Sequence, residues 1–154
     1  MSAGDSPILV FSVSDRRFGL RTSAVESVVR MVDVAPLPKA PGAVCGVIDV
    51  AGEIVPVFSI RRRFSMPERD FRVSDLIVLA RTRMRKVALA AEEVLDVVKP
   101  KEETESSPDD VGIPAAPVSG VVRTPDGLIL ITDLDAFLSA ADEKQLEEAL
   151  RDRD

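Results

Sequence analysis

Short apolar runs separated by turn residues dominate the chain. The runs are rich in Val, Ile and Leu and have the length of strands, as at 8–11, 77–80 and 128–131. Turn-forming residues lie between them, as at Ala51-Gly52 and Pro125-Asp126-Gly127. Many short runs at this spacing are typical of β-barrels rather than of strands alternating with long helices. The pattern therefore predicts a mainly β protein.

The same pattern occurs twice along the chain. Residues 8–29 contain an apolar run, a second apolar segment and a Val-rich segment, and residues 77–98 repeat these blocks in the same order. Residues 46–60 likewise match residues 120–134, each with a Gly-Val start, a turn and a second apolar run. Two ordered copies of the same blocks indicate a duplicated supersecondary unit.

The repeat predicts two β-barrel lobes within a single domain that spans residues 1–154. We expect the lobes to cover approximately 8–64 and 76–138. A charged helix is expected at 142–152, because Leu146, Ala149 and Leu150 form an apolar stripe at helical spacing.

Short helical turns are expected between strands, where side chains can cap a helix. Ser59 and Asp133 are the expected N-caps of the turns that follow them. Ser23 and Glu26 have the spacing of a capping box. Pro56 lacks an N–H group, which predicts an edge or bulged position for its strand. The loop 99–118 is rich in proline and acidic residues, and its role is left open.

Composition narrows the possible functions. The 154 residues carry a net charge of −6, which disfavours binding to nucleic acid or to anionic lipid. The chain contains no histidine, tryptophan or tyrosine and one cysteine, Cys45. No signal peptide and no apolar run long enough to span a bilayer are evident. We therefore expect a cytoplasmic protein without cofactor or metal and without direct insertion into a membrane.

The candidate chemical groups favour structural roles. Adjacent carboxylates such as Glu92-Glu93 do not face one another on a strand or helix, so solvated side chains are expected. Cys45 has no histidine to activate it and lies among apolar residues, which indicates a buried structural thiol. The basic cluster Arg61-Arg62-Arg63 and a second near Arg81 are interpreted as solvated surface, with contact to an acidic protein as the alternative. The sequence therefore contains no evident catalytic site.

The ordered blocks resemble the CheW-like family of chemotaxis coupling proteins. The resemblance includes the opening Ile8-Leu9-Val10-Phe11, the turn Ala24-Val25-Glu26-Ser27-Val28, and the end block Asp133-Leu134-Asp135-Ala136-Phe137-Leu138. Its most specific part is Leu37-Pro38-x-Ala40-Pro41 followed by Gly46-Val47-Ile48-Asp49-Val50-Ala51-Gly52-Glu53-Ile54-Val55-Pro56-Val57. Together these blocks cover residues 8–138.

The resemblance implies a fold of two small five-stranded SH3-like barrels and a non-enzymatic adaptor function. Such proteins join the cytoplasmic signalling tips of chemoreceptors, the methyl-accepting chemotaxis proteins, to the regulatory domain of a CheA-type histidine kinase. The receptor-facing groove would then include Val25, Val28, Gly46 and Ile48. Ala51, Glu53 and Pro56 would lie on a protein-facing patch of the hairpin 49–57, on the side of the kinase.

Two departures from the family pattern separate two adaptor hypotheses. The family usually has arginine at the position of Ala51 and glutamate at that of Ser27, a pair of opposite charges close enough to interact. The first hypothesis is a standard coupling protein that joins receptor and kinase. The second is an auxiliary adaptor that binds receptors but has lost the standard kinase interface. A small enzyme or ligand-binding barrel is a third, less favoured hypothesis.

Overall fold

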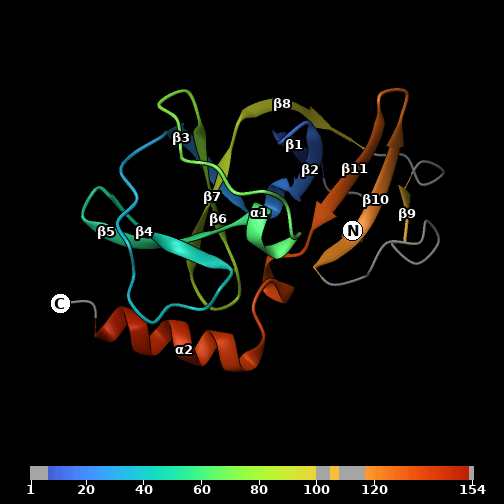
Figure 1. Cartoon of the computed structure of the whole chain (residues 1–154). Helices are drawn as coiled ribbons and strands as arrows, with labels where there is room; N and C mark the ends of the chain where they lie inside the picture. The colour runs from blue at the N-terminus through green and yellow to red at the C-terminus, as the bar shows by residue number, and fades with distance from the viewer. Residues whose placement is uncertain (1–6, 100–104, 108–116, 153–154) are drawn as a thin grey trace.

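Two antiparallel-rich β-sheets make up most of the molecule (Figure 1). The structure is a computed structural model, and it describes residues 7–99, 105–107 and 117–152. The first sheet has the strand order β8 (Glu93–Val98), β1 (Ile8–Val13), β2 (Arg16–Arg21), β11 (Gly127–Thr132), β10 (Val118–Thr124) and β9 (Glu105–Ser106). The second has the order β3 (Val25–Arg30), β6 (Leu76–Arg81), β7 (Lys86–Ala91), β5 (Glu53–Phe58) and β4 (Val44–Val50). The prediction of a mainly β fold is confirmed.

The two repeats exchange strands, so that neither sheet is built from one repeat alone. In the first sheet, β1 and β2 of the first repeat pair with β8 and β11 of the second. In the second sheet, β6 and β7 of the second repeat pair with β3 and β5 of the first. The sheets thus differ from the expected contiguous lobes 8–64 and 76–138. The sequence pattern identifies matching blocks, but it does not reveal which copy of a block pairs with which.

The exchange has the same register in both sheets. The parallel pair β2–β11 aligns Gly19 with Ile131, and the parallel pair β5–β7 aligns Val57 with Ala88. In each sheet one edge strand pairs with a strand of the other repeat, β3 with β6 and β8 with β1. Each of these edge strands carries a bulge near its start. Since the repeats match in pairing and in bulges, the sequence repeat corresponds to a structural pseudo-twofold arrangement.

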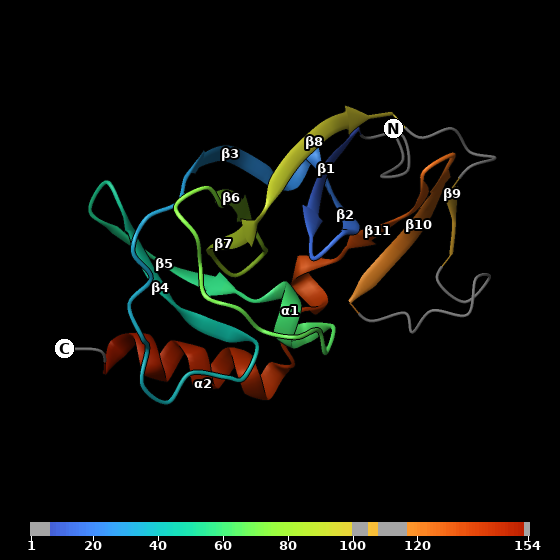
Figure 2. The same ribbon diagram turned by 45° about the horizontal axis from the view of Figure 1, so that its top comes forward.

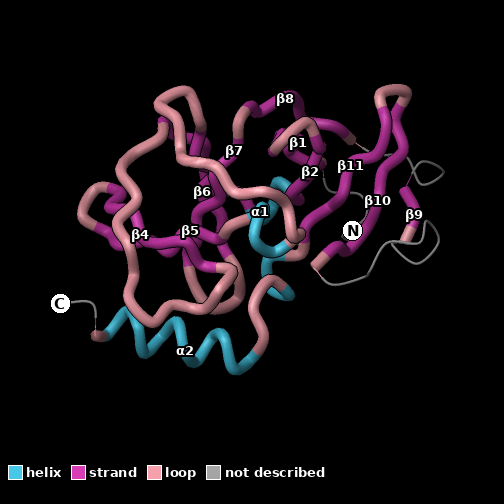
Figure 3. The backbone as a smooth tube through the Cα atoms, in the orientation of Figure 1, coloured by secondary structure: helices cyan, strands magenta, loops and turns pink. Residues whose placement is uncertain are grey.

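The short helical segments follow the caps that the sequence predicted, with one exception (Figure 3). Ser59 caps α1 (Ile60–Arg63) by accepting a hydrogen bond from the Arg62 N–H. Asp133 caps the 3₁₀ turn Leu134–Ala136 in the same way. The expected capping box at Ser23 and Glu26 is wrong. Ser23 lies inside the 3₁₀ turn Thr22–Ala24, which has no side-chain cap, and Glu26 belongs to β3.

The C-terminal helix α2 (Ala140–Arg151) begins slightly before the predicted 142–152. Ser139 accepts a hydrogen bond from the Asp142 N–H, and the Asp142 carboxylate accepts one from the Ser139 N–H, which completes a capping box. Leu146 and Ala149 are buried against the core between the sheets. Arg85 anchors the helix to the second sheet through Glu143 at 3.0 Å. No helix in the described part of the chain is long and apolar enough to cross a bilayer.

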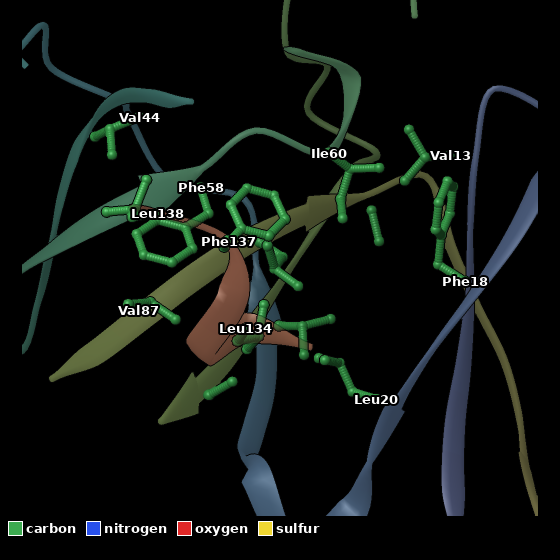
Figure 4. Close-up of a cluster of buried hydrophobic side chains, with 14 of the residues drawn as sticks. Val13, Phe18, Leu20, Val44, Phe58, Ile60, Val87, Leu134, Phe137 and Leu138 are labelled. Carbon is green, nitrogen blue, oxygen red and sulfur yellow. The ribbon is translucent and has the colours of Figure 1, made fainter. Parts of the chain in front are cut away.

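Three apolar clusters form the interior of the protein. One lies on the inner face of each sheet, around Ile8 and Val10 in the first and around Val55 and Ile77 in the second. The largest lies between the sheets; we call it the inter-sheet core. It contains aromatic and aliphatic side chains from both sheets and from the C-terminal segment (Figure 4), namely Val13, Phe18, Leu20, Val44, Phe58, Ile60, Val87, Leu134, Phe137 and Leu138. Because side chains alternate along a strand, one face of each sheet lies in the cluster of that sheet and the other face lies in the inter-sheet core.

Gly46 allows β4 to bulge beneath the segment that precedes it. Its φ is +155°, and a Cβ there would meet the carbonyl oxygen of Ala35 and the side chain of Val34. Ala35 pairs with Val47 through two backbone hydrogen bonds of 2.8 Å, so this contact cannot relax without breaking the bridge. Glycine at this position is therefore a requirement of close backbone approach.

We expect Gly46→Ala to lower the free energy of unfolding by about 2 kcal/mol, because the new methyl group would overlap backbone atoms. Gly42→Ala is the matched control, since a Cβ at Gly42 has no neighbour within 4 Å. Urea denaturation of both variants measures the difference. Equal stability of the two variants would contradict the proposed backbone contact.

Candidate partner-binding surface

Val25 and Val28 lie on β3, on the face that looks toward the inter-sheet core. Val25 pairs with Ala80 and Val28 with Val78, and both partners belong to that core. Directly paired residues of antiparallel strands present their side chains on the same face. Val25 packs partly buried against the core, whereas Val28 is 38% exposed. The two predicted groove residues therefore share one face, and exposure increases along the strand.

The second repeat places matching valines on β8. Val94 pairs with Phe11 and Val97 with Leu9, again residues of the inter-sheet core. Val94 packs partly buried against that core, and Val97 is 55% exposed. Neither residue was predicted from the sequence to lie in the groove. The repeat itself contains the signal that could have found them, because Val94 and Val97 stand where Val25 and Val28 stand in the first copy.

The four valines form an apolar rim, which we call the valine rim: Val25, Val28, Val94 and Val97. The strands β3 and β8 that carry it lie near each other in two views of the molecule (Figures 1 and 2). Among the described strands, each is the edge strand of its sheet, so its outer backbone groups have no ladder partner there. Leu95, the bulge residue of β8, adds a side chain that is 41% exposed. The rim is thus an exposed continuation of the inter-sheet core.

Gly46 and Ile48, also expected in the groove, lie elsewhere. Both are on β4, which forms the opposite edge of the second sheet from β3. Ile48 is 1% exposed and belongs to the cluster inside that sheet. Gly46 is buried beneath Ala35. The structure does not bring these residues into the valine rim, so any effect they have on binding would act through the shape of β4.

The three residues of the expected hairpin patch have different environments. Ala51 lies at the exposed β4–β5 turn with φ +51°, followed by Gly52, whose N–H donates to the Asp49 carboxylate. Glu53 is exposed at the start of β5. Pro56 is buried and pairs with Val47 of β4, at a point where the β5–β7 ladder has not yet begun. The ladder begins only at Val57, which explains how a residue without an N–H group is accommodated in an interior strand.

An ion network connects the hairpin to β3. The Glu26 carboxylate contacts Arg81 Nε at 2.9 Å and Lys86 Nζ at 3.2 Å. Lys86 also contacts Glu53 at 3.3 Å. Hydrogen bonds from Arg81 and then Lys86 hold the pKa of Glu26 below its usual value. The network ties the bulge of β3 to β6, β7 and β5.

A cavity of about 400 Å³ lies beside α1 and has Cys45 among its lining residues. Arg61 is engaged by Glu92 at 2.6 Å, Arg62 by Glu68 at 2.7 Å, and Arg69 by Asp75 at 2.8 Å. The cations of the cavity are thus neutralised by the chain's own carboxylates. Burial raises the pKa of the Cys45 thiol to about 11, so the thiol is protonated and unreactive at neutral pH.

Asp75 fixes the loop that borders this cavity. Burial by itself would raise the pKa of its carboxyl group, but hydrogen bonds from Arg69 and from the Arg72 N–H outweigh burial and lower it. The charged side chains of Arg69 and Asp75 therefore stabilise this loop. Across the described segments, no group of three or more His, Cys, Asp or Glu side chains is arranged to hold a metal ion.

Fold and site together define a duplicated two-sheet protein with an exposed apolar rim. A family model described as "CheW-like domain" matches residues 7–142, and the chain belongs to this family. It is 25% identical to the chemotaxis protein CheW of Treponema pallidum over 145 residues, covering 90% of this chain and 85% of that protein. It is 26% identical to CheW of Bacillus subtilis over 148 residues, covering 95% and 93%.

A solved structure shows the same fold. The crystal structure of the scaffolding protein TtCheW from Thermoanaerobacter tengcongensis matches with a TM-score of 0.79 and 27% identity, covering 90% of each chain. The predictions of a CheW-like fold and of a non-catalytic scaffold protein are confirmed by this family membership.

We expect Cys45 to react with iodoacetamide at pH 7 about 100-fold more slowly than an unperturbed cysteine of pKa 9.0, because two pKa units reduce the thiolate fraction by that factor. The chain has no other cysteine, so mass spectrometry of the intact protein follows this reaction directly. Modification at the rate of free cysteine would contradict the burial of this thiol.

The Glu26 network predicts a pH dependence of stability. Since the folded state holds the Glu26 pKa below 4.5, its stabilisation is fully present above pH 4.5 and is lost as the pH falls through the folded-state pKa. Glu26→Gln should therefore be less stable than the original chain at pH 7, and the difference should disappear toward pH 3 (roughly one to two units below the usual pKa). Urea titrations at both pH values measure it. A difference of equal size at both would contradict the network.

Proposed function

We propose that this chain is a cytoplasmic adaptor that binds the signalling tip of chemoreceptors along the valine rim. The observation that carries the proposal is the exposure of Val28 and Val97 on faces that elsewhere bury their side chains in the inter-sheet core. Exposed apolar side chains that gather on one surface are typical of a site where a protein partner binds. The names of the relatives, chemotaxis and scaffolding proteins, support a partner from chemotaxis signalling.

A helix fits this rim better than an extended peptide. The valines come from two strands that belong to different sheets, so an extended peptide paired with one edge strand would reach the valines of that strand alone. A helix with an apolar stripe presents side chains over several turns and would contact the valines of both strands at once. The cytoplasmic tip of a chemoreceptor supplies such helices, and recruitment to receptor arrays follows from this binding.

The second part of the proposal is coupling to the regulatory domain of a CheA-type histidine kinase through the β4–β5 hairpin. The hairpin tip is exposed at Ala51 and ordered by the Asp49 carboxylate, so it is available for contact. One observation favours the auxiliary adaptor instead. Ala51 offers only a methyl group at the tip, and Glu53 is already engaged by Lys86. Weakened kinase binding is therefore the second candidate.

Charge substitutions on the rim test receptor binding. Val28→Asp and Val97→Asp should each weaken binding of a receptor signalling-tip fragment at least about tenfold, because an unpaired carboxylate would face apolar surface. Val73→Asp is the matched control, since Val73 is 97% exposed and lies outside the rim. Isothermal titration calorimetry gives the affinities, and circular dichroism checks the fold. Val25→Asp is less suitable, because Val25 packs against the core.

The same titration against the kinase regulatory domain separates the two adaptor hypotheses. Binding to receptor and kinase supports a coupling protein, and binding to the receptor alone supports the auxiliary adaptor. In the second case, Ala51→Arg combined with Ser27→Glu should strengthen kinase binding, since it restores the charge pair usual in the family. Binding to neither partner would contradict the proposed function.

A further inference from the structure

A basic residue lies at the end of each strand that carries the valine rim. Arg30 ends β3 two residues beyond Val28, and the pairing of β3 with β6 is regular over this stretch. Residues two apart on a strand share a face, so Arg30 continues the face that carries Val28. Arg30 is exposed and makes no ion pair within the described residues.

Lys99 occupies the matching position of the second repeat. It lies two residues beyond Val97 and one residue past the end of β8, as Arg30 lies beyond Val28. It is also exposed, and no ion pair joins it to another described residue. By contrast, the cations on the neighbouring strands, Arg81 and Lys86, are held by Glu26. The two rim cations are therefore available to an external partner.

The exposure of the side chains along β3 and β8 places the two cations outside the apolar part of the rim. On both strands the first valine, Val25 or Val94, packs against the inter-sheet core, and the next, Val28 or Val97, is more exposed. Arg30 and Lys99 follow at the outer end of each wall. The pseudo-twofold arrangement thus gives an apolar centre with one cation beyond it on each side.

We propose that the rim selects a helix whose apolar stripe carries an acidic side chain toward each end, one held by Arg30 and the other by Lys99. This inference rests on the proposed function and specifies the chemistry of its partner. The valines supply contact area, and the cations select the partner and fix its position along the rim, as complementary charge does at protein interfaces. The chain's net charge of −6 disfavours nucleic acid or a membrane as the source of the negative charge.

Charge reversal tests the inference. Arg30→Glu and Lys99→Glu should each weaken binding of the receptor-tip fragment about fivefold at 0.1 M salt, and the double variant about 25-fold (estimates of the order expected for exposed charge pairs). The loss should shrink at 1 M salt, since screening removes exposed charge interactions. Arg123→Glu on β10 is the control, because it makes the same charge change at an exposed position of the first sheet that is far from β8 in the strand order. Replacing the fragment's acidic flanking residues with lysine should restore binding to the double variant.

The outcomes separate this inference from the proposed function. If the original chain does not bind the fragment at all, both are overturned. If it binds but neither reversal changes the affinity, or Arg123→Glu weakens binding as much, the inference alone is overturned. Binding of the original chain to anionic phosphatidylserine vesicles, lost in the double variant, would also overturn it, because the cations would then recognise lipid.

Discussion

The inter-sheet core is the interaction on which the rest of this structure depends. Each sheet buries one face in its own cluster, and it must cover the other face against its neighbour. Its side chains are mostly aliphatic, and its aromatic rings pair as Phe58 with Phe137, ring centroids 5.0 Å apart, and as Phe11 with Phe18, 6.1 Å apart. The helix α2 closes one side of this core with Leu146 and Ala149. The chain passes from one sheet to the other between β2 and β3 and again between β7 and β8, so both repeats contribute strands to each side of this core.

The same constraint explains why the candidate binding surface lies where it does. An interior strand has neighbours on both sides, but β3 and β8 are edge strands that carry core-facing side chains to the boundary of the sheets. Because no further strand of the described segments follows at these edges, Val28 and Val97 remain exposed. The Glu26 network holds the bulged start of β3 against β6, β7 and β5, and so keeps one wall of the rim in place. Binding would thus use surface that the fold exposes by its construction.

Much of the architecture could be predicted from the sequence, because strand periodicity, turn residues and N-caps such as Ser59 are local signals. The internal repeat correctly indicated duplicated blocks. The exchange of strands could not be inferred, since pairing between β2 and β11 or between β5 and β7 depends on contacts distant in sequence. The same limit applies to the site. Val25 and Val28 were selected from a resemblance to the family, and their counterparts on β8 were missed although the repeat aligns them. Ile48 shows the opposite case, because its pattern does not tell an inward side chain from an outward one.

Hydrogen–deuterium exchange of the chain, with and without a receptor signalling-tip fragment, tests the central claim most directly. The outer amides of β3 and β8 have no ladder partner within residues 7–99, 105–107 and 117–152, so they should exchange quickly in the free chain and slow down when a helix covers the rim. The account predicts protection at Val25–Arg30 and Glu93–Val98 together. Protection confined to the β4–β5 hairpin, with both edge strands unchanged in the complex, would contradict it.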